Sequence, residues 1–375
     1  MRDLFWVSFA ALFYIYIGYP LLIWGLALLF GREPKKEGIT PAVSFLIPAY
    51  DEEIQIEEKL RNTLGLDYPQ EKLEIVVASD GSTDKTNAIV ERYRSKGIRL
   101  IRMDHHVGKS AMLNMIVPHL KGEIIVFSDT SSHLEPGALK NLVRNFADPR
   151  VGCVCGLYRL AGSADLRSEG EGLYWKYETF IKRQESRLHS ILGAHGALYA
   201  IRKDLFEPLS GFSINDDYLI PMKIVSAGYR AVYEPEAVAW EKEMASVEGE
   251  FARRRRIAAG NCQQVVELRR MLNPLLGWTA LSFFSHKVLR TLAPLFMIAL
   301  FISGFWLPAG LAKSVFLLQS LFYLAAYAGY FCQQKGLPIP VLSPVFYFCF
   351  GNFAMLAGLF RYLLSGKRVA WDRAR

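Results

Sequence analysis

Carboxylates mark three polar clusters of the sequence, SDGSTD, SDTSS and INDD, that could bind a ligand or take part in a reaction. Asp80 in the first cluster could accept hydrogen bonds from a ribose hydroxyl or a base edge. Asp129 and the hydroxyls beside it are hard oxygen ligands, which suit magnesium or manganese. Both clusters also have a purely structural explanation. Gly81 favours a turn, and Asp129 could cap the helix that follows it.

The third cluster contains two adjacent acids, Asp216 and Asp217, preceded by Asn215. Adjacent acids at a helix start commonly only cap the helix and complement its dipole. Two close carboxylates also push one pKa upward, which suits a general base that must take a proton from a hydroxyl. Spacing alone leaves both explanations open.

Basic residues supply two further candidates. The segment GKS around Lys109 is not a P-loop, because that motif needs a glycine where this chain has Met103. Lys109 could contact a nucleotide or be a solvated lysine in the first turn of a helix. The run RRRR at 253–256 points in several directions around a helix, so at least one arginine could face a diphosphate while others meet lipid headgroups.

The elements that must position these residues alternate along the chain from Ala42 to about Tyr233. The β-rich runs VSFLIP, LEIVVAS and EIIVFSD are separated by helix-like stretches, which predicts a mostly parallel sheet covered on both faces. Ligands bind such sheets beyond the carboxyl ends of the strands. Each run ends in polar residues at that place, at 50–53, 80–84 and 129–132.

Residues 4–30 form an apolar run without a charge, longer than the roughly 20 residues that a membrane-spanning helix needs. A cleaved leader is the weaker alternative, because a basic start followed by a cleavage site is lacking. Arg32, Lys35 and Lys36 follow at once. By the positive-inside rule they place this flank in the cytosol.

Three further apolar segments follow Arg270, at 288–306, 314–332 and 340–364, and residues 278–287 read as an amphipathic interfacial helix. One span before the domain and three after it would leave the basic tail outside, against the positive-inside rule. Either one late segment is re-entrant or split, or the tail is an exception. Gly351 and Asn352 are where a break would be least costly.

Composition narrows the class of protein. A length of 375 residues allows one sizeable catalytic domain plus several membrane helices, and 51% of the residues are hydrophobic. The net charge of +8 does not indicate nucleic acid, because the basic residues are not interleaved with aromatic ones. A membrane surface and a diphosphate ligand account for the charge. The spacing of the five cysteines indicates neither a disulfide framework nor a zinc site.

Six segments, in this order, resemble the membrane-bound family-2 glycosyltransferases, which include cellulose, hyaluronan and poly-N-acetylglucosamine synthase-like enzymes: IPAYDEE, ASDGSTDKT, GKSAMLN, FSDTSS, INDDYLIPMK and RRRRIAAGN. The resemblance implies a cytosolic GT-A domain, an α/β fold with a Rossmann-like, mostly parallel sheet, flanked by transmembrane helices in the cell membrane. It divides the chain into an N-terminal helix (1–31), a catalytic domain (40–240), interfacial helices with RRRRI (241–287), about three C-terminal helices (288–366) and a basic tail (367–375).

The same resemblance implies a nucleotide-sugar donor, usually a UDP-sugar, and a divalent cation, Mg²⁺ or Mn²⁺, that bridges its phosphates. The residues expected to bind the donor are Pro48, Ala49, Tyr50, Glu52, Asp80, Lys109, Asp129 and Arg256. The family's Asp-X-Asp metal motif reads Asp129, Thr130, Ser131 here. Because the second acid is missing, Ser131 is a weak metal ligand beside Asp129.

The family's Thr-Glu-Asp motif is matched by Asn215, Asp216 and Asp217, so the resemblance gives Asp217 the role of general base. The Gln-X-X-Arg-Trp motif is matched by residues 253–257. Arg256 takes its diphosphate-binding place, and Ile257 replaces the tryptophan that helps processive synthases to hold the acceptor sugar.

The expected reaction is a single displacement that inverts the anomeric centre and transfers the sugar to a lipid-linked or polysaccharide acceptor. His195 either faces the sugar or only packs. Within the same class, the rival is a processive synthase that also translocates its polymer. Outside it, a catalytically inactive membrane scaffold is the distant alternative, and a transporter is weaker because the P-loop fails.

Overall fold

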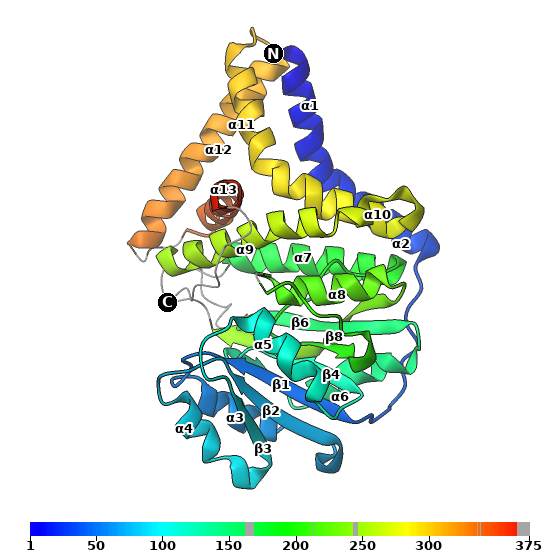
Figure 1. The fold of residues 1–375 in the computed structure, drawn as a ribbon. Helices are drawn as coiled ribbons and strands as arrows, with labels where there is room; N and C mark the ends of the chain where they lie inside the picture. Colours follow the sequence, from blue (N-terminus) through cyan, green and yellow to red (C-terminus); the bar gives the residue numbers. More distant parts are fainter. Residues whose placement is uncertain (162–168, 212, 243–246, 336, 338, 366–375) are drawn as a thin grey trace.

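The computed structural model describes residues 1–161, 169–211, 213–242, 247–335, 337 and 339–365. Figure 1 shows three layers: a sheet domain, the long helices α7 (Glu169–Leu188) and α9 (Val247–Glu267) across its top, and a group of apolar helices above them. The helix α9, which carries the arginine run, lies between the sheet domain and the apolar helices.

The sheet has eight strands in the order β3-β2-β1-β4-β7-β6-β8-β5. In its first half β3 (Ile98–Arg102), β2 (Leu73–Ser79), β1 (Val43–Ala49) and β4 (Ile124–Phe127) are all parallel. In its second half β7 (Tyr199–Arg202) is antiparallel to both neighbours, β6 (Val151–Ala161) and β8 (Arg230–Lys242) are parallel, and β5 (Ser132–Leu134) is antiparallel to β8. The predicted α/β sheet is confirmed, with parallel pairing concentrated in the first half.

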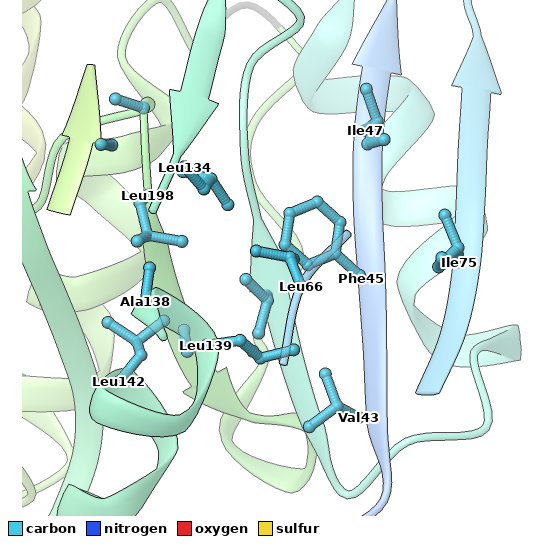
Figure 2. Close-up of a cluster of buried hydrophobic side chains, with 14 of the residues drawn as sticks. Val43, Phe45, Ile47, Leu66, Ile75, Leu134, Ala138, Leu139, Leu142 and Leu198 are labelled. Atoms are coloured by element: carbon cyan, nitrogen blue, oxygen red, sulfur yellow. The ribbon is translucent and has the colours of Figure 1, made fainter. Parts of the chain in front are cut away.

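The strands are buried on both faces, which explains their unbroken apolar sequences. Alternate side chains of β1 enter different cores: Val43, Phe45 and Ile47 lie in one, and Leu46 lies in the other. Figure 2 shows the first core, where Phe45 faces side chains that include Leu134 and Leu139. Burying each large apolar side chain contributes about 1.5–3 kcal/mol to folding.

Helices cover the two faces of the sheet. The first core receives buried side chains from α3 (Ile56–Leu64), α4 (Thr86–Glu91) and α6 (Ala138–Val143). The second receives them from α5 (Lys109–Ile116) and α8 (Asp216–Ser226). The helix predicted after the acid pair is thus present as α8, and the strands predicted at the three β-rich runs are β1, β2 and β4.

Among the described residues, four helices are long and apolar enough to cross a membrane: Arg2–Phe30, Trp278–Trp306, Leu311–Gln334 and Leu342–Leu364. The first comprises α1 (Arg2–Phe13), a π-helical turn and α2 (Tyr19–Phe30). The second comprises α10 (Trp278–Ser282), a π-helical stretch and α11 (Arg290–Trp306). The remaining two are α12 (Leu311–Gln334) and α13 (Leu342–Ser365).

Two local expectations about these helices differ from the structure. Residues 278–287 do not form a separate interfacial helix, because they continue without a break into α11. No break occurs at Gly351 and Asn352 either, since α13 is helical through both. The Asn352 side chain donates to the Phe348 carbonyl and accepts from the Tyr16 hydroxyl, so its polar groups are bonded without breaking the helix.

Candidate active site

The loops that follow β1 and β2 are joined by hydrogen bonds at the carboxyl edge of the sheet. The backbone N–H of Glu52 donates to Thr86 Oγ1 over 2.7 Å, and that of Thr83 donates to Asp51 Oδ1 over 2.8 Å. The Tyr50 ring stacks on the ring of His106 with 4.2 Å between centroids. Of the other residues predicted for the nucleoside pocket, Pro48 is half-buried and Ala49 is buried at the end of β1.

Asp80 lies beneath this edge and is only 1% exposed. Its two carboxylate oxygens accept the backbone N–H groups of Val107 and Gly108 over 2.8 and 2.9 Å. The loop it holds passes so close to Gly81 that a Cβ there would lie 2.5 Å from the loop backbone. In this structure Asp80 therefore orders the loop that precedes Lys109, and both of its oxygens are already bonded.

Lys109 is the first residue of α5 and connects two of the predicted acids. Its Nζ lies 2.9 Å from Asp129 Oδ1 and 3.2 Å from Asp216 Oδ2. Burial disfavours its charge, but the carboxylates of Asp129 and Asp216 outweigh burial and raise its pKa. Of the two explanations left open by the sequence, a solvated lysine is therefore wrong.

Gly196, a residue for which no role was predicted, brings Asp129 and Asp217 together. Its carbonyl accepts the backbone N–H of Asp129 over 3.0 Å, and its own N–H donates to Asp217 Oδ2 over 2.9 Å. A Cβ at this position would lie 2.4 Å from Asp129 Oδ2. Only glycine allows this approach, so one residue sets the distance between the two acids.

Asp216 and Asp217 begin α8 in different environments. Asp216 is 5% exposed, and its side chain is paired with Lys109. Burial, and next the charge of Asp216, raise the pKa of Asp217 to about 6, although Lys109 opposes the shift. Asp217 is thus a carboxylate that can accept a proton near neutral pH.

Arg256 is the arginine of the run whose charge interacts with these acids. Among the described residues its buried Nε has no hydrogen-bond partner. Burial lowers its pKa, while Asp217, Asp129 and Asp216 act in the opposite direction. Arg253 and Arg254 differ, because each pairs with the carboxylate of Glu250.

The α9 helix is held close to the start of α8. A Cβ at Gly260 would lie 2.5 Å from the Asn215 side chain, and Asn215 Nδ2 donates to the Ile257 carbonyl over 3.2 Å. Asn215 therefore connects the acid pair to the helix that carries Arg256. The half-buried Ile257 takes part in this contact through its backbone.

His195 packs against aromatic rings. It stacks on Tyr158 with 4.1 Å between centroids and lies edge-on to Trp175 at 5.2 Å. Burial, followed by the charges of Lys182 and Arg253, lowers its pKa to about 3, so it is neutral at physiological pH. Its Nδ1 accepts the Ala197 N–H over 3.2 Å, which leaves the proton on Nε2.

Ser131 lies beside a carboxylate that the sequence did not associate with it. Its Oγ donates to Glu241 Oε1 over 2.6 Å, across 110 positions of the chain. Among the described residues, no three His, Cys, Asp or Glu side chains cluster as a metal site would require. The oxygens of Asp129, Ser131 and Glu241 nevertheless have the hard-ligand chemistry that suits Mg²⁺ or Mn²⁺.

A buried lysine beneath Asp129 was also missed. Lys59 in α3 is 2% exposed, and its Nζ donates to Ser128 Oγ and to the Ser132 carbonyl over 2.6 and 2.8 Å. It therefore holds both ends of the segment that carries Asp129 and Ser131. A lysine in an amphipathic helix gives no sequence signal of such a role, because its usual place is the solvated face.

The chain is similar to known glycosyltransferases. Residues 44–209 match the family described as glycosyl transferase family 2. The probable glycosyltransferase YdaM of Bacillus subtilis is 29% identical over 253 residues, which are 61% of this chain and 57% of that protein. The poly-β-1,6-N-acetyl-D-glucosamine synthase of Staphylococcus aureus is 26% identical over 230 residues, 60% of this chain and 54% of that one. The chain thus spans little more than half the length of these relatives.

The structure of the mannosyltransferase PcManGT from Pyrobaculum calidifontis, in complex with GDP-Man and Mn²⁺, is similar over 97% of this chain and 99% of that chain, with a TM-score of 0.74 and 26% identity. The predicted GT-A fold is therefore confirmed, together with helices apolar enough to cross a membrane. Residues 44–209 of the chain are thus a domain that matches glycosyl transferase family 2.

Proposed function

We propose that the chain transfers a sugar, with inversion, from a nucleotide-sugar donor to a lipid-linked or polysaccharide acceptor at the membrane surface. The observation that carries this proposal is the buried Nε of Arg256, which has no hydrogen-bond partner in the described part of the chain; the charge of Arg256 interacts with Asp217 and Asp129. A buried guanidinium whose Nε is not bonded by the described residues can receive an added anion, and a planar, permanently charged fork suits a diphosphate.

Asp217 acts as the general base in this proposal. With a pKa of about 6 it is mostly ionised at pH 7, yet basic enough to take a proton from an acceptor hydroxyl. The hydroxyl oxygen attacks the anomeric carbon as the bond to the diphosphate breaks, so the configuration inverts. Gly196 fixes one carboxylate oxygen of Asp217 by a hydrogen bond and so orients the base.

Lys109 holds the neighbouring acids in place. It pairs with Asp129 and Asp216, while burial and the charge of Asp216 raise the pKa of Asp217 to about 6. A divalent cation, Mg²⁺ or Mn²⁺, would be held at Asp129 and would neutralise the donor phosphates when bound. The PcManGT complex with GDP-Man and Mn²⁺ supports this cation.

The catalytic unit is taken as residues 40–240, facing the cytosol beneath the cell membrane. Arg32, Lys35 and Lys36 after the first apolar helix support this orientation through the positive-inside rule. Residues 241–287 then carry the chain back to the membrane, and α9, the helix that contains Arg256, lies between the sheet domain and the apolar helices. An acceptor anchored in lipid can reach Asp217 from this side.

We take α13 as a helix that lies along the membrane surface, and the other three apolar helices as spans. Figure 1 views α13 nearly end-on, whereas α11 and α12 run up the page. A Cβ at Gly358 would lie 2.4 Å from Ala258 Cβ, so α13 packs closely on α9. The Arg254 guanidinium also lies over the Phe350 ring of α13 at 5.7 Å.

The test uses the full chain purified in detergent with a panel of UDP-sugars and GDP-mannose, and measures the nucleoside diphosphate released with and without Mg²⁺ or Mn²⁺. We expect one donor to be consumed when acceptor lipid or glycan is added. Release by Asp217→Asn at the wild-type rate would reject the proposed role of this residue. No release from any donor with any acceptor would favour the inactive scaffold.

A processive synthase is the second candidate, supported by the name of the Staphylococcus aureus relative. Ile257 argues against processive synthesis, because this position lacks the aromatic ring expected to hold a growing glycan. Product length separates the two candidates. A single added sugar supports simple transfer, and a ladder of long products supports processive synthesis.

A further inference from the structure

The expected metal motif has Ser131 in place of its second acid. The fold brings another acid, Glu241, into contact with Ser131. Strand β5 pairs antiparallel with β8, and this register sets Ser132 opposite Glu241. Both serine hydroxyls donate to Glu241 Oε1, Ser131 over 2.6 Å and Ser132 over 3.2 Å. Among the described residues the second oxygen of Glu241, Oε2, has no hydrogen-bond partner, so it is available to a ligand.

The segment between the two acids is held in place from below. Lys59 bonds to Ser128 and to the Ser132 carbonyl, on either side of Asp129 and Ser131. Burial lowers the pKa of Lys59 to about 7, and the charges of Asp129 and Glu241 oppose that shift. Lys59 thus holds the segment that carries Asp129 and Ser131, and Glu241 is bonded to the same segment through Ser131.

We propose that Glu241 supplies the carboxylate that the motif lacks at Ser131, so that Asp129 and Glu241 together hold the divalent cation of the donor complex. This inference rests on the proposed function. Two carboxylates balance the charge of one dication, and oxygen ligands suit Mg²⁺ and Mn²⁺. Gly196 leaves Asp129 Oδ2 uncovered, because any side chain there would occupy the space beside that oxygen.

The competing explanation is a purely structural one, in which Glu241 only ties the short edge strand β5 to β8. Glu241→Gln separates the two explanations. The amide oxygen still accepts the hydrogen bonds of Ser131 and Ser132, whereas the charge that binds a cation is lost. The double variant Ser131→Asp with Glu241→Gln then returns an acid to the motif position itself.

The experiment measures Mn²⁺ binding to the full chain in detergent, from the loss of the free Mn²⁺ signal in electron paramagnetic resonance, with Mn²⁺ alone and with Mn²⁺ plus UDP. We expect Glu241→Gln to raise the Kd for Mn²⁺ on the order of tenfold or more, as loss of a metal-site partner commonly does. The double variant should recover most of that loss. Ser132→Ala serves as the matched control, because it removes one hydrogen bond to Glu241 and no charge.

An unchanged Kd in a folded Glu241→Gln variant, judged by its thermal unfolding, overturns the inference, and so does failure of the folded double variant to recover binding. If Glu241→Gln does not fold, Glu241→Asp is measured instead. The inference requires weaker Mn²⁺ binding in this variant, because the shorter side chain withdraws the carboxylate. An unchanged Kd for Mn²⁺ overturns the inference. Absence of Mn²⁺ binding by a wild-type chain that transfers sugar would overturn the inference and leave the proposed function standing. Mn²⁺ binding that depends on Glu241, in a chain that transfers sugar to no acceptor, would support the inference and overturn the proposed function.

Discussion

The backbone N–H of Gly196 donates to Oδ2 of Asp217 over 2.9 Å. The carbonyl of the same glycine accepts the N–H of Asp129, so one peptide segment spaces the proposed base from the proposed metal ligand. The spacing depends on the absence of a side chain, because a Cβ would lie 2.4 Å from Asp129 Oδ2. The proposed base and the proposed metal ligand are therefore both hydrogen-bonded to the backbone of Gly196, a residue that has no reactive side chain.

Gly196→Ala should consequently damage transfer while the chain still folds. The added methyl group must displace Asp129 or the loop, which costs about 1–3 kcal/mol of stability. A displacement of the reacting groups near 1 Å lowers the rate on the order of 10²-fold. Initial rates of nucleoside diphosphate release and the unfolding temperature measure the two effects.

Gly211→Ala is the control for that variant, since a Cβ there would meet nothing within 4 Å. We expect its rate and unfolding temperature to stay near those of the wild type. Equal activity of Gly196→Ala and Gly211→Ala would show that the close approach at Gly196 does not matter for transfer.

Asp217→Asn should lower turnover by about 10²–10⁴-fold while donor binding persists, because an amide cannot take the proton. The wild-type rate should also fall as the pH drops below about 6, where Asp217 becomes protonated. A plateau extending unchanged to pH 5 would contradict the role of Asp217 as base.

The same substitution should change stability in the opposite direction. The pKa of Asp217 in the folded chain, about 6, exceeds its ordinary value of 3.8, so the native state holds this proton more tightly than the unfolded state. The stability from protonation is fully present below pH 3.8 and is lost as the pH rises through 6. Asp217→Asn should thus raise the unfolding temperature at pH 7.5 and leave it nearly unchanged at pH 4. A lower unfolding temperature at pH 7.5 would contradict this account.

Sequence reasoning located the parallel half of the sheet because β1, β2 and β4 are unbroken apolar runs that end in polar residues. It did not find β5, since three residues with one exposed histidine between two buried neighbours carry too weak a pattern. The contact between Ser131 and Glu241 depends on that strand, so it was missed as well.

Some side-chain roles were missed because the local sequence around a residue does not show which distant residues it contacts. Lys109 was expected to contact the donor, but its pairing with Asp129 and Asp216 was not foreseen, because the fold brings these acids to it. His195 was left with two explanations, because the rings of Tyr158 and Trp175 that surround it come from distant positions. Separation along the chain, rather than unusual chemistry, limited the prediction at each of these residues.

Arg256→Lys should weaken donor use while it preserves the positive charge. Lysine lacks the planar fork, and losing one hydrogen bond to a charged group costs about 1.5–3 kcal/mol, or roughly 10–100-fold in kcat/KM. Steady-state kinetics with varied donor concentration measure the loss. Arg270→Ala, at an exposed arginine beyond α9, is the control and should behave as the wild type. Equal kcat/KM for the two variants would remove Arg256 from the donor site.

If α13 lies along the membrane surface, the chain that follows α13 is on the cytosolic side of the membrane. If α1–α2, α10–α11 and α12 span and α13 lies on the surface, a reporter fused after the last residue faces the cytosol. This agrees with the positive-inside rule for a basic tail. A green fluorescent protein fusion in a bacterial host should therefore fluoresce, and an alkaline phosphatase fusion at the same point should be inactive. Fusions at Gly310, between α11 and α12, should give the reverse pattern. An active phosphatase after α13 would mean that all four apolar helices cross the membrane, because only a fourth crossing moves that point outside.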